Sequence, residues 1–213
     1  MEKKKVVLAF SGGLDTSYCA IYLAKEMGFS DAWIAALSGK TAAAIKALRG
    51  ELAAAHKEAD KPGAALCGIN LEGPFLSMAK KGAQNGDWLH APDVDMLRRL
   101  VAASHGLVKL VSLAPEEPGA MKFIEEMESE VTISLAHTTA DYDTAMEAFR
   151  LGARQVTHLF NAMPPFTHRA PGVIGAAFDH PGTRVELICD GIHIHPSVVR
   201  ATFALFGAER VVL

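Results

Sequence analysis

Three residues in the middle of the sequence have the side chains that a catalytic zinc site uses. Glu72 follows the apolar run AALCGINL, His137 follows VTISLA, and His158 lies within QVTHLF. A carboxylate and two neutral imidazoles, with one position left for water, are a familiar ligand set for catalytic zinc. Such a site lowers the pKa of bound water towards about 7, which provides a hydroxide nucleophile at neutral pH. The three residues therefore predict metal-dependent hydrolysis.

Short apolar runs with strand character alternate with amphipathic helical stretches along most of the chain. The strand-like runs cover residues 5–10, 64–71, 107–113, 131–136, 155–160, 185–189 and 210–213. The helical patterns cover residues 16–27, 41–58, 93–104, 118–128, 141–151 and 196–206. Gly152 ends one of these helices in the manner of a C-terminal cap. Strand–helix–strand repetition at this spacing predicts right-handed crossovers and a parallel sheet.

The positions of the ionisable residues favour a closed barrel over an open sheet. Ionisable side chains stand at or near the ends of successive runs: Glu72, Glu116, His137, His158, and Asp190 with His193. A (β/α)8 barrel builds its active site at these strand ends, whereas an open sheet concentrates it at one switch point. We therefore predict an α/β fold with an incomplete (β/α)8 TIM-type barrel. Six barrel-like strands, the last of them at the end of the chain, predict a fragment of that barrel.

Composition excludes several classes of function. Half of the 213 residues are hydrophobic and the formal net charge is -3, so neither nucleic acid nor an anionic membrane is an expected partner. No run of 18 apolar residues occurs, and we expect no signal peptide. Three separated cysteines, Cys19, Cys67 and Cys189, argue against a disulfide framework and favour a reducing compartment. We expect a cytoplasmic protein.

Five segments together resemble the N-acetylglucosamine-6-phosphate deacetylase family. They are NLEGPFLSMAKKGAQN (70–85), SLAPE (112–116), AHTTADYDTAMEAFRLG (136–152), THLFNAMPPFTHRAPGVIGAA (157–177) and LICDGIHIHP (187–196). The resemblance implies a metal-dependent hydrolase of the amidohydrolase kind, acting in amino-sugar catabolism. Its substrate would be the small molecule N-acetylglucosamine 6-phosphate, and its products glucosamine 6-phosphate and acetate. Zinc is the preferred divalent metal, although iron and manganese accept the same ligands, and a homo-oligomer remains open.

The resemblance also implies roles for individual residues. Glu72 stands in the family's LEGP motif, His137 matches the histidine of its GH-[ST] motif, and His158 matches that of THLFNAM; all three would bind metal. Arg169 offers a forked donor suited to phosphate, and Asn161 can donate to and accept from sugar hydroxyls. The substrate pocket would comprise Ala83, Asn161, Ala162, Arg169, Asp190, Gly191, Ile192 and His193.

The sequence departs from the family pattern at several positions. Asn70 and Gln84 stand where the family usually has histidine, and Ala136 replaces a glycine. The histidine at the position of Gln84 would help to polarise the amide carbonyl. The catalytic aspartate of the family follows the strand matched by residues 210–213, so we expect no catalytic aspartate in this chain. Gln84 and the expected lack of the catalytic aspartate both predict impaired deacetylation.

The first 30 residues have a different character. Residues 3–29 resemble the start of argininosuccinate synthase, with the motif SGGLDTS between a strand-like and a helical stretch. Backbone N–H groups at such a loop and helix N-terminus can cradle phosphates. The alternative function is therefore an ATP-binding, ligase-type site at Ser11, Gly12, Gly13, Asp15, Thr16 and Ser17; a third option is a fragment without a ligand. We predict two segments, residues 1–30 and a partial deacetylase barrel over 31–213.

Overall fold

The computed structural model describes residues 5–8, 65–104 and 106–213. Its strands are β1 (Lys5–Leu8), β2 (Ala65–Phe75), β3 (Val108–Leu113), β4 (Thr132–Leu135), β5 (Gln155–Val156), β6 (Arg184–Glu186) and β7 (Val211–Val212). Its α-helices are α4 (Val94–Ala103), α5 (Ala120–Met127), α6 (Tyr142–Leu151), α7 (Gly172–Asp179) and α8 (Pro196–Phe206). Short 3-10 helices cover Met78–Lys80 (η1), Gly86–Trp88 (η2) and Ala208–Arg210 (η3).

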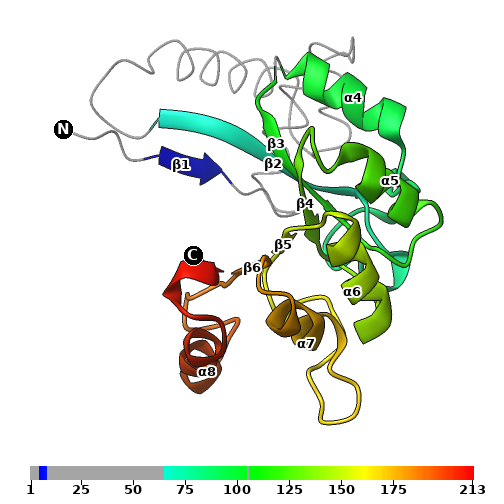
Figure 1. Ribbon diagram of the computed structural model, residues 1–213. Coiled ribbons are helices and arrows are strands. Elements are labelled where there is room, and N and C mark those ends of the chain that lie inside the picture. Colours follow the sequence, from blue (N-terminus) through cyan, green and yellow to red (C-terminus); the bar gives the residue numbers. More distant parts are fainter. Residues whose placement is uncertain (1–4, 9–64, 105) are drawn as a thin grey trace. The chain divides into compact units, whose positions relative to one another are not determined.

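The strands form one sheet in the order β1-β2-β3-β4-β5-β6-β7, which is also their order along the chain (Figure 1). The β1–β2, β4–β5, β5–β6 and β6–β7 pairs are parallel. Strands that follow the chain order and are joined by helices are typical of a (β/α) barrel. The sequence predicted six barrel-like strands, and the described residues contain seven, because β1 also pairs with β2.

Two compact units divide the chain, and each has its own internal contacts. Of the described residues, 5–8, 65–72, 95–104 and 106–110 belong to the first unit, and 73–94 and 111–213 belong to the second. In the second unit α6 packs against both α5 and α7 (Figure 1). Both candidate histidines lie in this second unit, while Glu72 directly precedes its first residue, Gly73.

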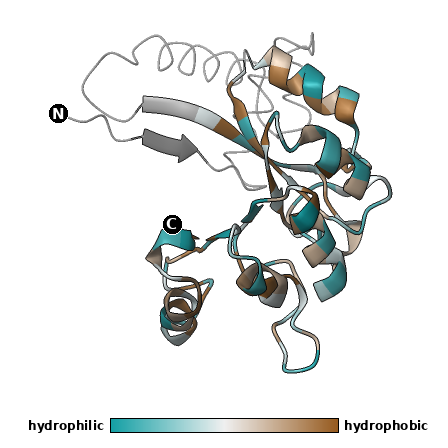
Figure 2. Cartoon of the chain, viewed as in Figure 1, coloured by the Kyte–Doolittle hydropathy of each residue, from teal (hydrophilic) through white to brown (hydrophobic). Residues whose placement is uncertain are grey.

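The core of the second unit is built from the apolar faces of its strands and helices. Phe75 and Phe123 are fully buried and meet edge to face, with ring centroids 5.0 Å apart. Ile133, Leu135 and Phe149 are also fully buried. The ribbons of β3 and β4 are largely hydrophobic, whereas α5 and α6 carry residues of both kinds, as expected for helices with one buried face (Figure 2).

Helix α6 shows why the predicted pattern folds as it does. The Asp141 carboxylate accepts a hydrogen bond of 2.9 Å from Thr144 N at the N-terminus of the helix. At the other end Gly152 has a φ of 125° and its N–H donates to helix carbonyls, as the sequence predicted. After the helix the chain continues into β5, and His158 lies two residues beyond that strand.

Three elements differ from the sequence prediction. Strand β2 continues past Glu72 to Phe75, because Phe75 O accepts a hydrogen bond of 2.9 Å from Ala114 N beyond the end of β3. Strand β5 covers only Gln155–Val156, so His158 follows the strand instead of lying within it. Helix α7, Gly172–Asp179, was not predicted, because two glycines and β-branched residues have low helix propensity. Burial of Gly172 to Ala177 stabilises that helix.

Several predictions fall outside the described residues. They include the SGGLDTS loop and the helical patterns over 16–27 and 41–58. Within the part of the chain that the structure describes, no helix is both long and apolar enough to cross a membrane.

Candidate metal centre

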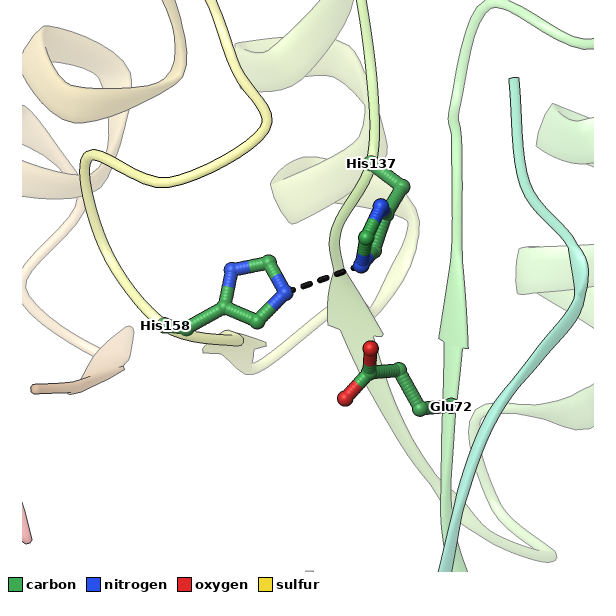
Figure 3. A group of neighbouring side chains, drawn as sticks. All are labelled: Glu72, His137 and His158. Carbon is green, nitrogen blue, oxygen red and sulfur yellow. Dashed lines mark hydrogen bonds between the residues drawn. The ribbon is translucent and has the colours of Figure 1, made fainter. Parts of the chain in front are cut away.

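Glu72, His137 and His158 form a group that could hold a metal ion. One ligand atom from each residue lies within 4.8 Å of the others. All three side chains are buried, with exposed fractions of 9%, 7% and 8% respectively. Figure 3 shows the carboxylate and both imidazole rings pointing toward one another. The three residues that the sequence singled out are therefore brought together by the fold.

A hydrogen bond fixes the orientation of the His137 ring. Its Nδ1 lies 2.7 Å from Lys80 O, a carbonyl that can only accept, so Nδ1 carries the proton. In the neutral ring this leaves a lone pair on Nε2, which faces His158 Nε2 at 3.0 Å (Figure 3). A backbone carbonyl behind a histidine is the usual means of presenting the opposite nitrogen to a metal.

The separation of the two imidazole nitrogens is close to that of a tetrahedral metal site. Two nitrogens bound to one zinc at 2.0–2.1 Å in tetrahedral geometry lie about 3.3 Å apart. The observed separation of the two Nε2 atoms is 3.0 Å, close to that value. The Glu72 carboxylate supplies a third ligand of the type that catalytic zinc accepts. In the metal-free protein, a proton on His158 Nε2 can be donated to the lone pair of His137 Nε2.

Both histidines sit in strained backbone conformations. His137 has a φ of 45° and His158 a φ of 35°, in the left-handed region that non-glycine residues rarely adopt. Phe160 and Ala162, which follow His158, also have positive φ values. Such residues cost about 1–3 kcal/mol each and persist only where the surroundings hold them in place. Strain of this kind concentrates at functional sites.

Backbone hydrogen bonds hold the two strained segments. Ser77 N donates to His137 O at 3.0 Å, and Thr138 N donates to Ala162 O at 3.0 Å. Asn161 N donates to His158 O at 2.9 Å. The second of these bonds joins the segment after β4 to the segment after β5. The two histidines are thereby positioned by neighbouring turns that share contacts.

The predicted substrate-binding residues occupy two kinds of surroundings. Asn161 and Ala162 are half-buried and belong to the turn that carries His158. Ala83, Arg169, Asp190, Gly191, Ile192 and His193 are exposed, Ile192 by 87%. No hydrogen bond or ion pair joins Arg169 to the other candidates within the residues that the structure describes.

Asp190 and His193 form a local pair on that exposed segment. Asp190 Oδ1 accepts from Ile192 N and His193 N at 2.8 and 2.9 Å, and Asp190 Oδ2 lies 2.6 Å from His193 Nδ1. The hydrogen bond from His193 N is the main cause that lowers the pKa of Asp190 to about 2, with Ile192 N next. Asp190 therefore remains ionised at neutral pH and directs His193 Nε2 away from itself.

Two departures from the family pattern have clear structural positions. Asn70 is 1% exposed, and its Oδ1 has no hydrogen-bond partner among the described residues. Gln84 is half-buried after η1, and its N–H donates to Lys81 O at 3.0 Å. Sequence reasoning missed Lys80, because its contribution to His137 is a backbone carbonyl, which every residue possesses.

The class of protein follows from these observations and from solved structures. The chain has the fold of an incomplete (β/α)8 TIM-type barrel of the metal-dependent amidohydrolase kind, as the sequence predicted. Glu72 lies near the carboxyl end of β2, and His137 and His158 lie just beyond the ends of β4 and β5, which is the side on which that fold places its active site.

Comparison with known proteins shows similarity to sugar-phosphate deacetylases. The chain is 43% identical over 160 residues to an N-acetylglucosamine-6-phosphate deacetylase of Bacillus subtilis (strain 168), which covers 75% of this chain and 40% of that protein. It is 34% identical over 153 residues to an N-acetylgalactosamine-6-phosphate deacetylase of Escherichia coli O157:H7, which covers 71% of this chain and 40% of the relative. The chain thus spans about 40% of the length of these curated relatives.

The chain is also similar to a solved structure. That structure is a mutant N-acetyl-D-glucosamine-6-phosphate deacetylase of Mycobacterium smegmatis in complex with N-acetyl-D-glucosamine-6-phosphate, with a TM-score of 0.71 and 28% identity. The match covers 98% of this chain and 55% of that one. No protein-family model matches the sequence.

Proposed function

We propose that this chain carries the metal-binding part of an N-acetylglucosamine-6-phosphate deacetylase, which hydrolyses the acetamide to glucosamine 6-phosphate and acetate. The observation that carries the proposal is the convergence of Glu72, His137 and His158. The sequence similarity to deacetylases supports the choice of reaction. Amide hydrolysis needs a nucleophilic water and a polarised carbonyl, and a buried carboxylate–imidazole group is suited to that chemistry.

Each residue of the group has a definite part. Glu72, His137 and His158 would hold a divalent metal, with zinc preferred for this donor set. When bound, that ion supplies Lewis acidity and lowers the pKa of water near the scissile amide. The hydrogen bond from His137 Nδ1 to Lys80 O keeps the ring in the tautomer that presents Nε2. Burial of all three side chains excludes bulk water from the donor atoms.

The sugar phosphate would lie over the neighbouring turns. Asn161 and Ala162 belong to the turn after β5, and His193 presents Nε2 because Asp190 engages its Nδ1. Arg169 is exposed and offers a planar pair of donors for phosphate. We further propose that Ala83, Gly191 and Ile192 line the same pocket. The widely separated cysteines fit a cytoplasmic protein, in keeping with a metabolic role.

The galactosamine epimer is the second candidate substrate. The observation that favours this substrate is the similarity to an N-acetylgalactosamine-6-phosphate deacetylase. The two sugars differ only in the orientation of one hydroxyl, so the same metal group serves both. We prefer N-acetylglucosamine 6-phosphate because the relative at 43% identity is named for that substrate.

Metal content, ligand binding and acetate release together test the proposal. We expect the chain loaded with zinc to retain about one equivalent after dialysis, as a site with three protein ligands should. Calorimetry should then show a higher affinity for N-acetylglucosamine 6-phosphate than for its galactosamine epimer. Acetate release should require the metal. Retention of less than about a tenth of an equivalent would contradict the metal centre. Metal binding without any affinity for either sugar phosphate would contradict the substrate instead.

A further inference from the structure

Glu116 is a half-buried carboxylate just beyond the C-terminal end of β3, and it has three hydrogen-bond donors. Thr138 Oγ1 donates to its Oε2. Thr139 N and Thr139 Oγ1 both donate to its Oε1, at 2.5 and 2.9 Å. All three donors are N–H or O–H groups, so the carboxylate acts purely as an acceptor. Each donor belongs to the two residues that follow His137.

The segment that Glu116 holds is the one whose backbone is strained. His137 has a φ of 45°, and the chain must then turn into the approach to α6. Thr138 is fully buried, and its hydroxyl also accepts from Ala140 N at 2.9 Å, so both functions of that hydroxyl are used. The anchor at Glu116 therefore acts on the residue directly after His137.

The same segment is tied to the other histidine. Thr138 N donates to Ala162 O, while Asn161 N donates to His158 O. A chain of contacts thus runs from Glu116 through Thr138 to the turn that carries His158. None of these contacts involves a ring nitrogen of either histidine, so Glu116 acts on the direction of the rings and leaves their donor atoms free for a ligand.

We infer that Glu116 is a positioning residue for the metal centre, holding His137 and, through Thr138, the turn of His158 in the geometry that a metal ion needs. This inference rests on the proposed function. It predicts that Glu116 governs metal affinity and coordination geometry, although its carboxylate is not one of the three ligands. Charge-assisted hydrogen bonds to a carboxylate are the strong kind that can hold a strained turn.

The experiment compares Glu116→Gln with Glu117→Gln in otherwise unchanged protein. Both variants lose one negative charge at neighbouring positions, and the Glu117 carboxylate accepts no hydrogen bond within the described residues. Zinc affinity is measured by competition with a chromophoric chelator. Loading with Co²⁺ reports the ligand geometry through its visible absorption, and urea unfolding of the metal-free protein reports stability.

We expect Glu116→Gln to weaken zinc affinity by about 10- to 100-fold, the usual effect of losing a residue that orients a ligand. Its Co²⁺ spectrum should change, and its metal-free unfolding midpoint should also fall below that of Glu117→Gln, because three hydrogen bonds are weakened. Equal zinc affinity in the two variants would overturn the inference. So would a loss confined to metal-free stability, since that would mark a purely structural residue.

A second variant keeps the test decisive if Glu116→Gln does not fold. Thr139→Ala removes one donor at an exposed position and should weaken zinc affinity by a smaller factor. An unchanged affinity in Thr139→Ala, with Glu116→Gln unfolded, would overturn the inference. Failure of the unmodified chain to bind zinc would overturn the proposed function and this inference with it. Normal binding by the unmodified chain and by both variants would overturn the inference alone.

Discussion

The turns after β4 and β5 differ sharply from the segment after β6 in how they hold their functional side chains. His137 and His158 are buried, have positive φ values, and are held by backbone bonds from other elements. Asp190 and His193 are exposed and bond chiefly within their own four-residue segment. Contacts with other parts of the fold hold the buried turns, whereas local hydrogen bonds hold the exposed segment.

This difference suits the two tasks that we propose. A metal site needs ligands fixed to within a fraction of an ångström, and a buried and interlinked turn provides that precision. A sugar phosphate has to enter and leave, and an exposed segment allows that exchange. The energetic cost of the positive φ values falls on the buried side, where packing and hydrogen bonds offset it.

The largest expected effect is the loss of a buried ligand. His137→Ala removes an imidazole that no neighbouring side chain can replace, so metal affinity should fall by more than about 100-fold, beyond the range for residues that only orient ligands. Elemental analysis after dialysis measures it. His90→Ala is the matched control, because His90 is exposed and lies outside the metal group. Equal losses in the two variants would remove His137 from the centre.

Among the exposed candidate residues, Arg169→Met should lower the affinity for the phosphorylated sugar only. The change removes charge-assisted hydrogen bonds worth about 1.5–3 kcal/mol, so affinity for N-acetylglucosamine 6-phosphate should fall about 10- to 100-fold. Unphosphorylated N-acetylglucosamine should bind as before, which calorimetry can measure. Arg200→Met, on the exposed surface of α8, controls for the loss of charge. A parallel loss for both sugars would show that Arg169 does not recognise phosphate.

Asp190→Asn sharpens the comparison within the exposed segment. Asparagine can still accept from the backbone N–H groups but no longer offers a charged partner to His193 Nδ1. Sugar-phosphate affinity should fall by several-fold, about one neutral hydrogen bond. Since the pKa of Asp190 is lowered to about 2, the substitution removes a charge that is present at neutral pH. An unchanged affinity at neutral pH would contradict this role of Asp190, and Asp143→Asn serves as the control.

Most of the fold was accessible from the sequence because its signals are local. The helix predicted over 141–151 has an apolar stripe and a terminal glycine, and the structure confirms it over Tyr142–Leu151, with Asp141 as its N-terminal cap. Helix α7 was missed because its stability comes from burial and not from propensity. Gly175 illustrates this, since a Cβ there would lie 2.4 Å from Pro171 Cβ.

The metal group was predicted from residue types, but its supporting contacts were not. Glu72, His137 and His158 carry distinctive side chains at or near strand ends, and the structure brings them together. The positive φ values of both histidines and the hydrogen bond to the carbonyl of Lys80 could not be predicted, because they do not depend on distinctive residue types. Glu116 was noticed only as an ionisable residue at a strand end, because its partners lie 22 and 23 positions away.

The smallest expected effect concerns the cap of α6, which leads from the turn of His137 toward β5. Asp141→Ala removes the side-chain acceptor of Thr144 N and should lower the free energy of unfolding by about 1 kcal/mol. The hydrogen bond from Thr144 N is also the main cause that lowers the pKa of Asp141 below its usual value of 3.8.

A depressed folded-state pKa means that the cap stabilises fully above the unfolded pKa and loses its effect as the pH falls through the folded value. Urea unfolding should therefore show a constant difference between Asp141→Ala and the unmodified chain from pH 5 to pH 7. The difference should shrink as the pH falls below about 4. Asp143→Ala, in the same helical turn but without the capping bond, should cost less. If Asp141→Ala instead weakened metal binding as strongly as Glu116→Gln, the turn after β4 would depend on the helix as much as on its carboxylate anchor.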